Sequence, residues 1–479
     1  MGLKFCNTLS RTVEEFLPLN AGSKNVGMYC CGPTVYDFAH IGNWRTFVFS
    51  DLVRRCLEFK GLTVQHVMNI TDVEDKIIKR ARETKMSFRE LTGKFEAAFL
   101  EDLKTLNCLS PHHTPRATEH IPEIIALIEK LIVRGIAYKA TDGSVYFNIE
   151  KYRGSGCEYG QLVKLNFDEM RVGERVRTDE YAKESVADFA LWKARQPEDG
   201  DVFWPSPWGE GRPGWHIECS AMSMKLLGPS FDLHLGGEDL MFPHHEDEIA
   251  QSEGAGVQPA GQRFVKYWLH GAHLLVEGKK MSKSLGNFFT LRDLLAKGFT
   301  GREIRYLLLT AHYRETFNFT LEGLQGARAS LMRIDECLKK LRELAGSSSA
   351  GPLQAATTES PESLLTQFSA AIDDDLNVSA AWGAIFEWVR DVNRRLAEGS
   401  MDAPAAAIAL ATWDKLDSVL GVGAPSEVEV PIEINALLEA RQAARKSKDF
   451  KRADAIRDEL KAKGWVIEDT PKGARAKRL

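Results

Sequence analysis

Hydrophobic residues in the first 130 positions are spaced as in alternating strands and helices. Residues 26–31 form an apolar, β-prone run, and Gly32 and Pro33 end it. Beyond Gly42, apolar residues recur on one face of a helix until about residue 60. A strand, a tight turn and a helix are therefore expected to follow one another here.

A second strand is expected at residues 63–68, and helical patterns follow at residues 74–106 and 121–133. This β-α-β start predicts the α/β class, with a doubly wound parallel sheet of Rossmann type. Ligands of such sheets gather at the carboxyl ends of the strands. Thr34 and Thr71 each follow such an end, which makes them candidates for a binding site.

The pattern changes farther along the chain. Residues 135–207 lose the regular alternation, so we expect them to form an insertion between two halves of the sheet, and strand and helix patterns return afterwards. Two soft linkers, at residues 345–360 and 421–431, separate later helical regions. Long helices are expected over residues 321–344, 364–396, 405–420, 432–446 and 450–463.

The composition is that of an ordinary soluble globular protein, with 44% hydrophobic and 27% charged residues. A length of 479 residues predicts three or four domains. No apolar run approaches the ~18 residues of a membrane span, and the first residues lack the apolar core of an export signal. We therefore expect a cytoplasmic protein without a membrane partner. Eight cysteines without regular spacing indicate thiols or metal ligands rather than a disulfide framework.

Charge is distributed unevenly along the chain. The whole chain has a net charge of −5, whereas residues 441–479 contain 13 Lys or Arg and 6 Asp or Glu, a net charge of +7. A basic segment on an acidic protein is typical of a local contact with a polyanion such as nucleic acid. The alternative is a solvated terminal helix without a partner.

Two stretches carry candidate chemistry. The first runs from Cys31 to Asn43, where the turn before a helix presents backbone N–H groups that suit a phosphate. His40 and Asn43 add side-chain donors there, and Gly42 allows a nucleotide to approach the backbone closely. The second is the basic loop Lys-Lys-Met-Ser-Lys-Ser-Leu-Gly-Asn at residues 279–287, which taken alone could be ordinary solvated surface.

Together the two stretches resemble the HIGH and KMSKS signatures of class I aminoacyl-tRNA synthetases, read here as His-Ile-Gly-Asn and Lys-Met-Ser-Lys-Ser. Four further segments resemble bacterial cysteinyl-tRNA synthetases: Cys-Gly-Pro-Thr-Val-Tyr-Asp, Asn-Ile-Thr-Asp, Gly-Trp-His-Ile-Glu-Cys-Ser-Ala-Met and Phe-Pro-His-His-Glu. The resemblance extends over residues 5–469. It implies a ligase that activates L-cysteine with ATP and Mg²⁺ and transfers it to the terminal adenosine of tRNA(Cys).

The resemblance also implies roles for individual residues. The catalytic donors and cations would be His40, Asn43, Lys280 and Lys283. ATP would be bound by Thr34, His40, Gly42, Asn43, Asp239 and Lys283, and cysteine by Thr71, Trp215 and His234. The fourth signature position is Asn43 rather than His, and an amide donates hydrogen bonds but carries no charge.

One zinc ion per chain is implied, with Cys31, Cys219, His244 and Glu248 as ligands. His244 and Glu248 are four residues apart, so they share a helix face. Cys30 is a rival of Cys31, but neighbours on a strand point to opposite faces, and the family motif favours Cys31. His245 is expected beside the site or on the surface. Zinc would select the cysteine thiolate over a hydroxyl, whereas a closed structural site is the alternative.

The same resemblance divides the chain into six parts. They are the two halves of the Rossmann catalytic domain at 1–134 and 208–275, an inserted connective domain at 135–207, the KMSKS loop and stem-contact region at 276–320, a helical bundle at 321–425 and a C-terminal anticodon-binding domain at 432–479. We expect a monomer. Two rival functions remain: a ligase that joins cysteine to an amino sugar, which would lack the basic terminal segment, and a zinc-stabilised RNA-binding protein without catalysis.

Overall fold

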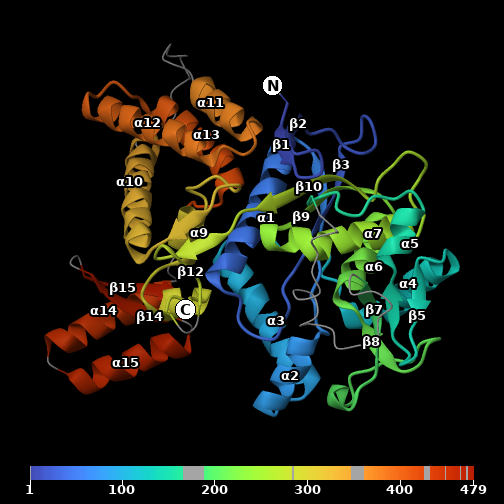
Figure 1. Cartoon of the computed structure of the whole chain (residues 1–479). Coiled ribbons are helices and arrows are strands. Elements are labelled where there is room, and N and C mark those ends of the chain that lie inside the picture. Colours follow the sequence, from blue (N-terminus) through green and yellow to red (C-terminus); the bar gives the residue numbers. More distant parts are fainter. Residues whose placement is uncertain are drawn as a thin grey trace. The chain divides into compact units, whose positions relative to one another are not determined.

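The computed structural model of the chain (Figure 1) describes residues 2–164, 188–282, 285–346, 361–424, 432–447, 449–463, 465–470 and 473–478. It forms two compact units, Met1–Val422 and Gly423–Leu479. None of the described helices combines the length and the hydrophobicity needed to cross a bilayer.

A four-stranded parallel sheet lies at the centre of the first unit, in the order β10-β9-β3-β4. Its strands are β3 (Asn25–Cys30), β4 (Thr63–Met68), β9 (Phe231–Gly237) and β10 (Val265–Gly271). The chain runs outward from β3 to β4, returns to β9 and continues outward to β10. The order therefore reverses between β3 and β9, which is where ligands bind in open α/β sheets. The predicted α/β, doubly wound fold is confirmed.

Helix α1 (Ile41–Phe59) connects β3 to β4, and its length follows from an apolar stripe that is almost continuously buried. The single helical pattern expected at residues 74–106 is two helices, α2 (Asp75–Thr84) and α3 (Phe88–Thr105). Lys85 ends α2 in a left-handed conformation (φ 55°), and the Ser87 hydroxyl caps α3. These local signals interrupt a continuous amphipathic pattern. Helix α4 (Ile121–Val133) has the expected bounds.

An antiparallel sheet follows, in the order β5-β6-β7-β8, with its own hydrophobic cluster against α4. Its strands are β5 (Ala137–Lys139), β6 (Val145–Phe147), β7 (Phe189–Ala194) and β8 (Gly211–Pro213), with α5 (Ile149–Gly154) after β6. Because β8 pairs with β7, this sheet continues beyond residue 207.

Further elements complete this part of the first unit. They are the hairpin β1 (Lys4–Asn7) and β2 (Thr12–Glu15), η1 (Ala117–Glu119), η2 (Pro197–Asp199), α6 (Trp215–Leu227), η3 (Glu238–Leu240), η4 (Met241–His245), α7 (Glu246–Gly254), β11 (Leu274–Val276), β12 (Lys279–Lys280), α8 (Leu291–Ala296), α9 (Gly301–Leu308) and β13 (Phe317–Phe319). Strands β12, β11 and β13 form a small sheet of their own.

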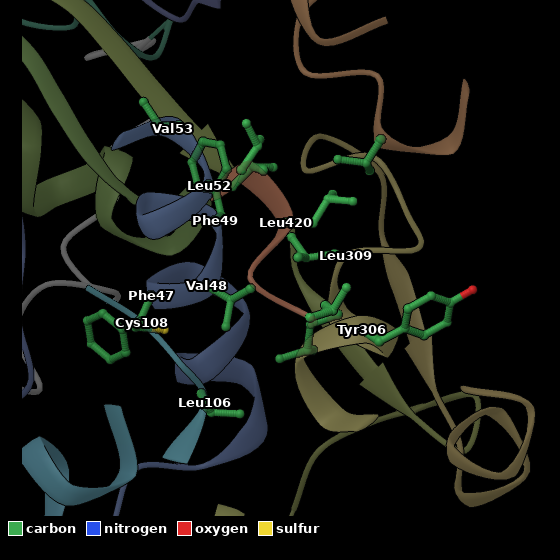
Figure 2. Close-up of a cluster of buried hydrophobic side chains, with 14 of the residues drawn as sticks. Phe47, Val48, Phe49, Leu52, Val53, Leu106, Cys108, Tyr306, Leu309 and Leu420 are labelled. Atoms are coloured by element: carbon green, nitrogen blue, oxygen red, sulfur yellow. The ribbon is translucent and has the colours of Figure 1, made fainter. Parts of the chain in front are cut away.

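Four helices end the first unit: α10 (Leu321–Gly346), α11 (Pro361–Asp373), α12 (Val378–Ala397) and α13 (Ala403–Leu420). The expected helix at 364–396 is thus divided in two, because Asp375 and Leu376 have positive φ and Asn377 caps α12. The core of these helices is continuous with that of the sheet. Figure 2 shows Val48 and Phe49 of α1 among the same buried side chains as Leu309 and Leu420.

The second unit contains α14 (Ile432–Lys446) and α15 (Phe450–Ala462), close to the expected bounds, and a hairpin that the sequence pattern did not reveal. This hairpin consists of β14 (Trp465–Thr470) and β15 (Gly473–Arg478). A small cluster that includes Leu460 and Trp465 forms the core of the unit.

Candidate active site

The first signature segment lies at the carboxyl end of β3. The turn at Gly32 passes directly against the next strand end, and a Cβ at this position would overlap the carbonyl oxygen of Asn69. The Gly32 N–H also donates to Asn69 Oδ1 at 2.8 Å. Only glycine fits here. The close approach of the two strand ends therefore explains why a glycine ends the apolar run of β3.

His40 and Asn43 form the start of α1. The Asn43 N–H donates to His40 Nδ1 at 3.2 Å, and the His40 N–H donates to Asn43 Oδ1 at 3.1 Å. This reciprocal capping box uses the carbonyl oxygen of the Asn43 side chain. The amide group therefore turns its N–H donors away from the cap. Asn43 itself is exposed, at a helix N-terminus that favours an anion.

The second signature segment packs against the first. A Cβ at Gly42 would stand 3.1 Å from the His40 ring and 3.3 Å from the Met281 methyl carbon. The Ile41 N–H donates to the Phe289 carbonyl at 2.9 Å, which fixes the chain after the loop to the same helix end. Two segments some 240 residues apart thus meet at one place. Lys280 is exposed, and Lys283 lies outside the described residues.

Four potential metal ligands converge beside the end of β3: Cys31, Cys219, His244 and Glu248. One ligand atom of each lies within 4.8 Å of the other three, and all four residues are buried. The two sulfur atoms are 3.9 Å apart, and His244 Nε2 is 3.1 Å from Glu248 Oε1. Tetrahedral bonds of ~2.3 Å from one zinc ion place two thiolates roughly 3.8 Å apart. The donor set therefore fits zinc in both chemistry and spacing.

Two of these potential ligands, His244 and Glu248, also form hydrogen bonds through their second nitrogen or oxygen atom. His216 Nδ1 lies 2.9 Å from His244 Nδ1, and His234 Nε2 lies 3.0 Å from Glu248 Oε2. His234 is fully buried and stacks on Trp268 at 4.4 Å between ring centroids. Such outer hydrogen bonds orient metal ligands and set their basicity.

The electrostatics of the cluster favour a bound cation. A hydrogen bond with Cys31 lowers the pKa of Cys219 to about 6. Burial tends to raise the pKa of Glu248, but His234 and His244 outweigh it and lower the pKa to about 2. Burial and the neighbouring Cys219 raise the pKa of Cys31 well above its ordinary value. A cation that binds both sulfur atoms would offset the free-energy cost of burying two deprotonated cysteines side by side.

Cys30 and Cys31 point in opposite directions, as neighbours on a strand must. Cys30 packs in the core with α1, where burial raises its pKa to about 12 despite a hydrogen bond with Ser50. Cys31 belongs to the cluster with Cys219. His245 is fully buried beside Cys31, so the possibility of a surface position is wrong. An overlapping set, Cys31, His234, His245 and Glu248, is also close enough to hold a metal ion.

The residues expected to hold the amino acid lie beside this cluster. Thr71 is buried and pairs with Thr34, while its hydroxyl accepts from Asn69 Nδ2 at 3.1 Å. The Trp215 ring lies 4.4 Å from that of His244. A pocket wall at Trp215 would therefore adjoin the metal cluster directly.

Models of known families match three parts of the chain. Residues 18–329 match "tRNA synthetases class I (C) catalytic domain", residues 367–424 match "DALR domain", and residues 427–475 match "Cysteinyl-tRNA ligase anticodon binding domain". A cysteine–tRNA ligase of Chlamydia muridarum is 47% identical over 100% of both chains, and one of Protochlamydia amoebophila is 44% identical over 99% of this chain and 98% of its own. The chain belongs to the cysteinyl-tRNA synthetase family.

Solved structures of other synthetases share its fold. A Mycobacterium tuberculosis methionyl-tRNA synthetase in complex with methionyl-adenylate has a TM-score of 0.60 at 15% identity, covering 84% of this chain and 89% of that one. A leucyl enzyme from Agrobacterium radiobacter K84 has a TM-score of 0.59 at 12% identity, covering 84% of each chain. At these identities the similarity shows the fold of class I synthetases and nothing finer.

In this member of the family, most of the predicted site residues that the structure describes lie at one edge of the sheet. His234 contacts Glu248 rather than an open pocket, so its role against the substrate backbone stays a prediction. Asp239 is exposed in η3, directly after β9. Asn69, His216 and His270 also contact the site but were not predicted from the sequence as site residues. Asn69 and His216 lie within the quoted family segments, whereas nothing in the sequence singles out His270.

Proposed function

We propose that this chain is a cysteine–tRNA ligase that selects its amino acid through a metal ion held by Cys31, Cys219, His244 and Glu248. The observation that carries the proposal is that this buried cluster includes Cys31, which begins the first signature segment, while Met281 of the second signature lies against Gly42 of the first. The substrates are L-cysteine, ATP with Mg²⁺, and tRNA(Cys).

In the first step, a carboxylate oxygen of cysteine attacks the α-phosphorus of ATP, and pyrophosphate leaves. Negative charge grows on the phosphoryl oxygens, so the catalyst consists mainly of placed donors and cations. His40 and the Asn43 amide present donors at the start of α1, and Gly42 leaves room for the nucleotide. Lys280 and Lys283 supply positive charge from the loop, and Asp239 and Thr34 bind the nucleotide as well.

The amino-acid pocket adjoins the metal cluster. Trp215 and Thr71 form its walls, and His234 holds Glu248 in place. A zinc ion with one open position would bind the substrate thiolate far better than the hydroxyl of serine. An amino acid without a thiolate cannot make the metal–sulfur bond and therefore binds much more weakly than cysteine. Such a site needs no separate editing reaction.

In the second step, a hydroxyl of the terminal adenosine of tRNA attacks the cysteinyl carbonyl, and AMP leaves. The basic segment of the second unit supports a contact with tRNA phosphates, and the exposed Phe450 can stack on an unpaired base. We propose that the enzyme acts as a monomer in the cytoplasm.

The deciding experiment is ATP–pyrophosphate exchange with cysteine, with serine and without amino acid, alongside metal analysis of the purified protein. Exchange with cysteine alone and about one zinc per chain would support the ligase. Charging of tRNA(Cys) rather than an amino sugar would then exclude the nearest enzymatic rival. Bound zinc without any exchange would contradict the proposal and favour an RNA-binding role.

A further inference from the structure

Two buried cations lie side by side on one face of the antiparallel sheet. Lys193 of β7 and Arg212 of β8 are direct partners in the strand register, and they are only 9% and 4% exposed. Like charges opposite each other on neighbouring strands repel, and burial strengthens the repulsion because water screens it less. This face of the sheet therefore requires carboxylates close by.

Two carboxylates from other elements meet this need. Asp75, the first residue of α2, accepts from Arg212 through Oδ1 and from Lys193 Nζ through Oδ2, the latter at 2.9 Å. Asp199 of η2 accepts from Arg212 Nε at 3.0 Å. Burial tends to raise the pKa of Asp75, but Arg212 and Lys193 outweigh it and hold the pKa below its ordinary value. Charged groups therefore join α2 to a sheet from a distant part of the chain.

The chain has no slack between Arg212 and the start of α6. A Cβ at Gly214 would overlap the carbonyl oxygen of Ala190 in β7, so only glycine fits there. The Gly214 N–H also donates to the Leu191 carbonyl at 2.9 Å. Trp215 follows directly as the first residue of α6. The position of Arg212 therefore sets the position of Trp215.

The other end of the ion pair is tied to Thr71 just as closely. Asp75 comes four residues after Thr71, whose N–H donates to the Pro33 carbonyl at 3.0 Å. Between them, Asp72 accepts from the Thr118 N–H at 3.0 Å and from its hydroxyl at 2.6 Å. The segment that carries Thr71 is therefore fixed as far as the start of α2.

We infer that Asp75 and Arg212 are positioning residues that set the width of the amino-acid pocket, because their ion pair joins the wall at Thr71 to the wall at Trp215. The inference rests on the proposed function, in which these walls flank the bound cysteine. Neither member of the pair is a proposed metal ligand, so its loss should loosen the pocket and leave the metal ion in place. A wider pocket holds cysteine less firmly and admits a longer amino acid. One methylene typically changes the selectivity of a pocket about 10–200-fold.

The test removes the carboxylate from the full chain with Asp75→Ala and returns it with Asp75→Glu. Arg212 keeps Asp199 as a partner in both variants. Because a misplacement of ~1 Å can cost about 100-fold, we expect Asp75→Ala to raise the KM for cysteine in pyrophosphate exchange roughly 10-fold. Its preference for cysteine over homocysteine, which is one methylene longer, should fall by a similar factor. The KM for ATP and the zinc content should stay at the wild-type values, and Asp75→Glu should recover most of both losses.

Glu210→Ala is the matched control. Glu210 pairs with Arg195 at 2.7 Å, and both side chains are exposed. Arg195 follows β7 and Glu210 precedes β8, so this pair stays within the region of the same sheet. The variant should keep the wild-type KM for cysteine and the wild-type preference over homocysteine.

An unchanged KM for cysteine and an unchanged preference in Asp75→Ala would overturn the inference. A higher KM for ATP together with loss of zinc would overturn it too, since that result indicates general loosening of the fold. If Asp75→Ala does not fold, Asp75→Asn takes its place, because an amide keeps the shape of the side chain without its charge. In both overturning cases, wild-type exchange with cysteine would still support the ligase. A wild type without cysteine-dependent exchange would remove the proposed function, and the inference with it.

Discussion

The sulfur atoms of Cys31 and Cys219 lie 3.9 Å apart, although 188 positions separate the two residues in the sequence. This separation is far above the ~2.05 Å of a disulfide and fits two thiolates on one ion. Cys219→Ser replaces a strong zinc ligand by a weak one. We expect zinc retention and cysteine activation to fall together, by more than the roughly 10–100-fold lost when a hydrogen-bond partner of a ligand is removed.

The zinc content after dialysis and the rate of pyrophosphate exchange would be measured on the same preparations. Cys30→Ser is the matched control, because Cys30 precedes Cys31 but packs in the opposite direction. That variant should retain zinc, even if its stability falls. A Cys219→Ser protein with full zinc and normal kinetics would contradict the ligand assignment.

Gly42 separates the His40 ring from Met281, and a Cβ at its position would stand 3.1 and 3.3 Å from them. Gly42→Ala should push the two signature segments apart by a few tenths of an ångström and narrow the approach for ATP. Misplacement of reacting groups by ~1 Å can cost about 100-fold, so we expect a smaller but clear loss in kcat/KM for ATP. Gly93→Ala in α3 has no atom within 4 Å of the new Cβ and serves as the control.

The Asn43 side chain accepts a hydrogen bond in the capping box through its oxygen and offers N–H donors to the nucleotide through its nitrogen. Two substitutions separate these roles. Asn43→Asp keeps an oxygen for the His40 N–H but replaces the amide donors by negative charge. We expect its melting temperature to stay near that of wild type while exchange activity falls, because the carboxylate repels the phosphates. Asn43→Ala also removes the acceptor for the His40 N–H, one of the two hydrogen bonds of the capping box, which costs about 0.5–1.5 kcal/mol. Equal exchange rates for Asn43→Asp and wild type would exclude a donor role.

Local rules explain which features were predictable from the sequence. Breakers such as Gly32, and the alternation that separates Cys30 from Cys31, act between near neighbours, so the sequence reveals them. The pairing of Asp75 with Arg212 and Lys193 depends on how the antiparallel sheet packs against α2, and no local pattern contains it. The break at Lys85 was missed for the opposite reason: one left-handed residue overrides a helical pattern that continues on both sides.

Phe450 is 61% exposed at the start of α15, in the basic segment. If it stacks on a base of tRNA, Phe450→Ala should weaken tRNA binding by about 1–3 kcal/mol. Pyrophosphate exchange needs no tRNA and should stay normal. Val133→Ala, which changes an 87% exposed side chain in α4, is the control for loss of exposed apolar surface. A parallel loss of exchange in Phe450→Ala would point to misfolding instead.

Asp51 of α1 and Arg305 of α9 form a buried ion pair of 2.5 Å, which joins the first signature helix to the helices that follow the second signature. Arg55 adds a second pairing at 2.7 Å, and Arg305 Nε also donates to the Leu420 carbonyl at 2.7 Å. Asp51→Asn leaves both guanidinium groups without their carboxylate. Breaking a buried pair typically costs about 3–5 kcal/mol, which denaturant unfolding would measure.

The same pair predicts how stability depends on pH. Burial tends to raise the pKa of Asp51, but Arg305 and Arg55 outweigh it and hold the pKa below its ordinary value. The stabilisation is therefore complete above the unfolded-state pKa of about 3.9 and is lost as the pH falls through the folded-state value. The stability advantage of wild type over Asp51→Asn should thus shrink only below about pH 4. Asp391→Asn, at an exposed pair with Arg394, should change stability by less than about 1 kcal/mol, and a similar loss in both variants would contradict the role of the buried pair.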